Sequence, residues 1–136
     1  MQQPREARFW MAWIPPKELR GNSRAHPMAK ARLAKQVRED AYIVAREVLA
    51  GKHGGDPFAS PVDVQYEFHL PGAKRSDPDN FIIGMKSWLD GVRDSGLIAG
   101  DSSKHITLAA PRFVSCKRGA EQTIVTITEI EERANA

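Results

Sequence analysis

The stretch VDVQYEFHL, residues 62–70, alternates apolar and polar side chains without an exception. Its apolar members are Val62, Val64, Tyr66, Phe68 and Leu70. Because successive side chains of a strand point to opposite faces, this pattern predicts a strand with one buried face. The other elements are predicted around it.

Further strands and helices are expected on both sides of this strand. They are a strand at 8–14, a helix at 28–50 closed by Gly51, a helix at 78–95 closed by Gly96, and strands at 104–113 and 121–130 joined by a hairpin at 115–120. The order β-α-β-α-β-β predicts an α+β fold, with two main helices packed on one mixed sheet. Residues 1–136 suit a single domain, with 131–136 as a frayed tail.

The helix predicted at 28–50 is apolar along one face and basic in its first half. Its apolar residues repeat at helical spacing: Val37, Ala41, Val44 and Val48. Its cations are Lys30, Arg32, Lys35 and Arg38. A basic arm near acidic residues suits a protein that holds a polyanion by its phosphates and also binds a cation. A soluble domain with a charged surface explains the charges equally well.

The composition argues against several classes of protein. Cys116 is the one cysteine, so no intrachain disulfide is possible and a reducing compartment is expected. No apolar run is long enough to cross a membrane, and the N-terminal residues lack the apolar core of a leader. No phosphate-binding or dinucleotide-binding glycine pattern is present. We therefore expect a cytoplasmic protein without a nucleotide cofactor.

The stretch SDPDNFIIGMKSWLDG, residues 76–91, begins the second predicted helix. Asp77 suits the N-cap and Pro78 the first helical position, which is a sufficient structural reason for both residues. At about 100° per residue, one apolar arc would face the core. This arc contains Phe81, Ile82, Met85, Trp88, Leu89 and Val92.

A polar stripe is predicted on another side of the same helix. It contains Asp79, Lys86 and Asp90, although the last two could simply pair on the surface. Asp101, in the loop after the helix, could return alongside it. Mg²⁺ prefers carboxylate oxygens and keeps several waters. The pattern therefore favours metal-assisted phosphodiester hydrolysis, with a lysine to orient the nucleophile or neutralise charge.

The motif resembles that of the RusA-type Holliday junction resolvases, which are crossover-junction endodeoxyribonucleases. The matching residues, over nearly the whole chain in order, are Asp77-x-Asp79-Asn80, Lys86, Asp90, Gly96 and Asp101, with weaker matches at Pro15-Pro16, Asn22 and HLPGAKR (69–75). The resemblance implies that Asp77, Asp79 and Asp101 are catalytic metal ligands and that Lys86 is the essential lysine. Asn80 and Asp90 would support the site.

The resemblance also implies a partner and a cofactor. It points to a homodimer that uses Mg²⁺, with Mn²⁺ as a substitute, to resolve four-way DNA junctions by paired nicks in opposed strands. Many members of that family are encoded by phages or prophages and act in DNA recombination and repair. The expected DNA-binding residues are Lys30, Arg32, Lys35, Arg38, Lys74 and Arg75.

Two other functions remain open at this stage: a less selective branched or flap endonuclease, and a DNA-binding module of the same fold that does not cleave. For the dimer interface, the candidates are an edge strand at 123–130 and the aromatic segment at 8–14.

Overall fold

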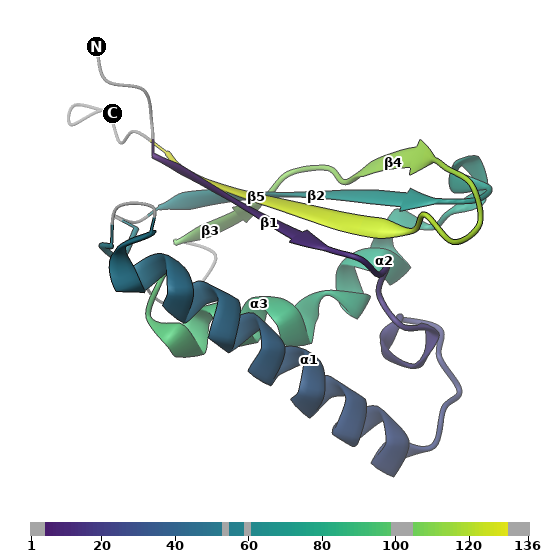
Figure 1. Ribbon diagram of the computed structural model, residues 1–136. Coiled ribbons are helices and arrows are strands. Elements are labelled where there is room, and N and C mark those ends of the chain that lie inside the picture. Colours follow the sequence, from purple (N-terminus) through teal and green to yellow (C-terminus); the bar gives the residue numbers. More distant parts are fainter. Residues whose placement is uncertain (1–4, 53–54, 59–60, 99–104, 131–136) are drawn as a thin grey trace.

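A computed structural model describes residues 5–52, 55–58, 61–98 and 105–130 (Figure 1). Five strands form one mixed sheet. They are β1 (Glu6–Met11), β2 (Val62–Leu70), β3 (Ile106–Leu108), β4 (Arg112–Ser115) and β5 (Gln122–Glu129). The strand order is β1-β5-β2-β3, and β4 pairs with a later part of β2.

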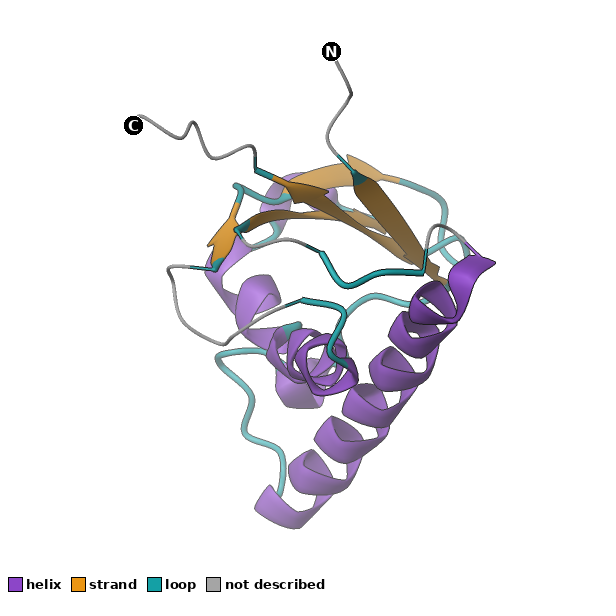
Figure 2. Cartoon of the chain, turned by 90° about the vertical axis from the view of Figure 1, so that its left-hand side faces the viewer, coloured by secondary structure: helices purple, strands orange, loops and turns teal. Residues whose placement is uncertain are grey.

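Three helices lie on the same face of this sheet (Figures 1 and 2). They are α1 (Pro27–Glu47), α2 (Pro78–Gly84) and α3 (Lys86–Ser95). Short 3₁₀ turns precede α1 and α2, at Lys17–Leu19 and Ala73–Arg75. The predicted α+β fold, with helices packed on one mixed sheet, is confirmed. Within the described ranges, none of the helices has the length and apolar character that a membrane crossing needs.

The alternation in β2 is confirmed residue by residue. Its apolar side chains are buried and its polar ones half-buried from one end to the other. Phe68 lies at the centre of an aromatic cluster, with ring centroids 5.1 Å from Phe81 and 5.5 Å from Phe113. The helices therefore cover the apolar face of β2, and its polar face is left as the open face of the sheet.

The predicted hairpin at 115–120 is wrong. β4 pairs with β2 in parallel and β5 pairs with β2 in antiparallel, so β2 lies between the two strands that the hairpin would have joined. The single strand predicted at 104–113 is also wrong, because two short strands, β3 and β4, lie along β2 and are interrupted at 109–111. At this interruption the side chain of Gln65 donates a hydrogen bond to the Ala110 carbonyl.

The edges of the sheet also differ from the prediction. β5 pairs with β1 on one side and with β2 on the other, so it is an interior strand and not an edge. The segment predicted at 8–14 forms β1, and it begins and ends earlier, at Glu6 and Met11. β1 is the edge strand on this side of the sheet.

The helix predicted over 78–95 is broken at Met85. Its φ and ψ of −93° and −2° end α2 and precede α3, and Gly96, with φ of 86°, closes α3 as expected. A Cβ on Gly84 would lie 2.7 Å from the Pro15 Cβ, so the loop after β1 presses directly on the end of α2. The predicted apolar arc is nevertheless buried on both sides of the break, at Phe81, Met85, Trp88, Leu89 and Val92. Asp79 and Lys86 of the predicted stripe are exposed, and Asp90 is half-buried.

Candidate functional site

The start of α2 is built around Asp77. Its Oδ1 accepts a hydrogen bond from the Asp79 backbone N–H at 3.0 Å, and Pro78 takes the first helical position. The Asn80 side chain donates to the Asp77 Oδ2 at 3.3 Å. The predicted N-cap is therefore confirmed, and Asn80 supports Asp77 directly.

Phe81 anchors this helix start on the sheet. Besides Phe68, it packs edge-on against Phe113 at 5.3 Å between centroids. On its other side the Arg20 guanidinium lies 4.4 Å from the ring centroid, and the Arg20 Nε donates to the Pro15 carbonyl at 2.9 Å. Burial lowers the pKa of Arg20. Arg20 thus connects the loop after β1 to the helix that carries the aspartates.

The carboxylates of Asp77 and Asp79 are exposed to solvent. Among the described side chains, none pairs with the carboxylate of Asp79, while Asp77 keeps lone pairs beyond its two hydrogen bonds. Two hard oxygen donors on a fixed helix start fit Mg²⁺, which retains several waters when it binds a protein. The residues present therefore fit the metal implied by the resemblance.

A third ligand is not available in the described part of the chain. No group of three or more His, Cys, Asp or Glu side chains suited to a metal is found there. Asp101, the predicted third ligand, lies outside the described residues. The metal assignment of Asp101 thus stays a prediction.

Lys86 and Asp90 do not pair with each other. The Asp90 Oδ1 instead accepts from the Arg93 Nη1 at 2.9 Å on the same helix. Lys86, the first residue of α3, is exposed and lines a hollow together with Lys30 of α1. Neither Asp77 nor Asp79 forms an ion pair with Lys86.

The cations predicted to bind DNA differ in their availability. Arg38 is bound to Asp94 of α3 through two hydrogen bonds, at 2.5 and 2.9 Å, which lower the pKa of the Asp94 carboxyl. Arg38 therefore ties α1 to α3. The remaining predicted cations have no ion pair among the described residues: Lys30, Arg32, Lys35, Lys74 and Arg75.

His69 lies on the open face of the sheet, opposite the helices. Its Nε2 is 2.7 Å from the Glu67 Oε2. Because Phe68 faces α2, the next residue along the strand must face away from it. His69 therefore faces away from the side of the sheet on which α2 lies.

Sequence reasoning named Pro15-Pro16 and Asn22 in the loop between β1 and α1, but it missed the cations of this loop. This loop carries Lys17 and Arg24, which line another hollow. It also carries Arg20, whose guanidinium packs on the Phe81 ring. Its contact with α2 runs through Gly21, which touches Asn80 and Ile83. The cations themselves were visible in the sequence, but the contact of the loop with α2 depends on tertiary packing.

No known family model matches the chain. The chain is 30% identical, over 122 residues, to an uncharacterized protein from Xylella fastidiosa strain Temecula1. That match covers 89% of this chain and 76% of the Xylella protein. The two proteins belong to one family.

Proposed function

We propose that the protein is a divalent-metal-dependent endodeoxyribonuclease that resolves four-way DNA junctions, similar to the RusA-type resolvases. The observation that carries this proposal is the exposed pair of carboxylates, Asp77 and Asp79, on a helix start fixed by Phe81 and Arg20. Cations of α1 and of the loop before it lie close to this helix. Such a combination suits a substrate that is a polyanion cleaved at a phosphodiester.

In this proposal the residues have separate roles. Asp77 and Asp79 would hold Mg²⁺, with Asp101 as the third ligand, and the chemistry supplied by the bound ion is activation of water and stabilisation of the departing oxygen. Asn80 keeps the Asp77 carboxylate oriented through its hydrogen bond. Lys86 supplies positive charge for the phosphate backbone. Because Cys116 is a free thiol, we place the protein in the reducing cytoplasm.

The test is a panel of substrates. Labelled four-way, flap and linear DNA are incubated with purified protein, with Mg²⁺ and with a chelator in its place. We expect cleavage of the four-way junction only with Mg²⁺. Cleavage that prefers flaps would favour the less selective endonuclease, and binding without cleavage of any substrate would favour the non-cleaving module.

We further propose that the protein acts as a two-fold dimer through the edge of β1. The Glu129 N–H donates to the Arg5 carbonyl at 2.9 Å, so in the antiparallel ladder the backbone groups of Glu6, Arg8 and Trp10 point away from β5. Among the described residues, no backbone group pairs with these three. An exposed edge of this kind is suited to pairing with another strand.

The charges on β1 favour one register for pairing with the β1 strand of a second copy of the chain. Antiparallel pairing centred on Ala7 would place Glu6 of each copy opposite Arg8 of the other, and opposite charges in facing positions stabilise strand pairs. Two subunits would then supply the two sites that paired nicks require, since the described chain has one such carboxylate pair.

Light scattering at micromolar concentration should give about twice the chain mass of 15.1 kDa. Arg8→Pro removes an outward N–H while leaving the bonds to β5 intact, so it should give a monomer. Arg8→Lys keeps both the N–H and the charge and should stay dimeric. A wild-type protein that remains monomeric on junction DNA and makes one unpaired nick would contradict the dimer and favour the flap endonuclease.

A further inference from the structure

Two hollows adjoin each other beside α2, one on each side of Ala25. The first, of about 410 Å³, lies in the loop before α1 and is lined by Lys17, Glu18, Arg20, Asn22, Ser23 and Arg24. The second, of about 510 Å³, lies between α1 and the start of α3. Its lining includes Lys30, Ala31, Ala34, Ile83, Lys86 and Ser87.

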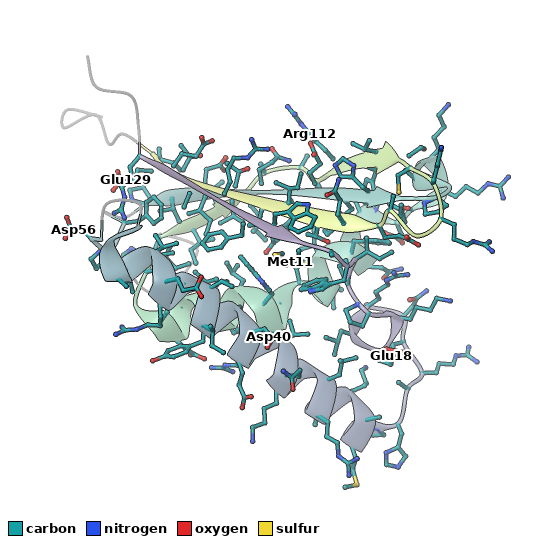
Figure 3. All side chains as sticks on the ribbon, in the orientation of Figure 1. Met11, Glu18, Asp40, Asp56, Arg112 and Glu129 are labelled. Carbon is teal, nitrogen blue, oxygen red and sulfur yellow. The ribbon has the colours of Figure 1, made fainter. Side chains whose placement is uncertain are left out.

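The second hollow reaches the helix that carries the aspartates, because Ile83 of α2 belongs to its lining. A Cβ on Gly21 would be 2.7 Å from both the Asn80 Oδ1 and the Ile83 Cδ1, so the loop is in direct contact with α2 at this point. Asn80 in turn donates to Asp77. The loop that forms the first hollow therefore contacts the helix that begins at Asp77, on the side of the molecule where Figure 3 labels Glu18.

The charge of these hollows is strongly positive. Four of their cations have no ion pair within the described ranges: Lys17, Arg24, Lys30 and Lys86. Glu18 is the one acidic residue in the two linings, and Arg20 is already engaged with Phe81 and Pro15. The second hollow is also lined by apolar residues, including Ile83, which is 51% exposed.

We propose that the sugar–phosphate backbone of DNA binds along the two hollows, which together form one continuous track. This inference rests on the proposed function. Lys30 and Lys86 contact phosphates from opposite walls of the second hollow, and the apolar residues between them face the deoxyriboses. Lys17 and Arg24 extend the track along the loop. Lys86 is thus a phosphate-binding residue on the α3 side of the second hollow.

The test measures binding apart from cleavage. A fluorescent four-way junction is titrated with protein in a chelator, and the dissociation constant is followed by anisotropy at several salt concentrations. Each lost phosphate contact should flatten the slope of log K against log salt by about 0.9, which corresponds to about eightfold weaker binding near 0.1 M salt. We expect this change for Lys30→Ala and for Lys86→Ala, and about 60-fold weaker binding for the double variant.

Arg112→Ala is the matched control, because Arg112 is exposed on the open face of the sheet, away from the helices (Figure 3). It should leave affinity and slope unchanged, and Lys86→Arg should retain binding. If both lysine variants bind with the wild-type slope, the track is overturned, even where the wild type cleaves junctions. If the lysine variants lose binding and no DNA is cleaved with Mg²⁺, the track stands and the nuclease proposal fails.

Discussion

Asp79→Asn is expected to lower junction cleavage by about 100-fold or more, which is the scale of losing a group that stabilises charge in a transition state. The carboxylate of Asp79 is exposed and takes no part in the hydrogen bonds that start α2, since Asp77 supplies the cap. The substitution keeps the shape of the side chain and removes one metal-binding oxygen and its negative charge. Binding of the junction should be unchanged or tighter, because a charge that repels phosphate is lost.

Asp56→Asn is the control for this variant. Asp56 is exposed near the opposite end of the molecule from α2 (Figures 1 and 3). The Asp56→Asn protein should cleave the junction at the wild-type rate. Asp77→Asn and Asp101→Asn should lose cleavage as Asp79→Asn does, and asparagine at position 77 still caps a helix. Cleavage by Asp79→Asn at the wild-type rate would refute the metal assignment.

Gly91→Ala is expected to destabilise the fold by about 3 kcal/mol. Gly91 lies where α3 crosses α1, and a Cβ there would be 2.1 Å from the Arg38 carbonyl oxygen and 2.8 Å from the Ala41 Cβ. The nearest atom belongs to backbone, so the helices must move apart to admit the methyl group. The better helix propensity of alanine, about 1 kcal/mol, is too small to offset this cost.

Urea denaturation followed by circular dichroism measures the loss. Gly119→Ala is a matched control, because nothing lies within 4 Å of its Cβ position, and its positive φ of 94° should cost only about 1 kcal/mol. Equal losses in the two variants would show that the close crossing of α1 and α3 is not a stability determinant.

Local patterns predicted the elements that local chemistry determines. β2 was predicted with its observed bounds because its alternation matches the pleat of a strand. The N-cap at Asp77 and the helix end at Gly96 were also predicted, since both depend on neighbouring backbone groups.

Long-range contacts account for the errors. The break at Met85 accompanies the packing of Pro15 on Gly84, which no helical periodicity can reveal. The hairpin failed because β2, more than forty residues earlier, inserts between β4 and β5. Nothing in the sequence indicated that Arg38 would bind Asp94, 56 positions away.

The candidate site was predictable only in part. Asp77, Asp79 and Asn80 lie together because they are neighbours in the sequence. The grouping of Lys86 with Lys30 depends on how α1 packs beside α3, and the loop with Lys17 and Arg24 reaches α2 through Gly21. Such groupings follow from the packed fold, and the sequence alone predicted only the charges.

The most direct measurement of the central claim maps nicks on a four-way junction. The junction is labelled at the end of each strand in turn and incubated with wild-type protein and Mg²⁺, and the products are sized on a denaturing gel. We expect nicks at symmetric positions in two opposed strands, and none when Mg²⁺ is chelated. An intact junction at protein concentrations that saturate binding, with Mg²⁺ or Mn²⁺ present, would contradict the assignment of this protein as a resolvase.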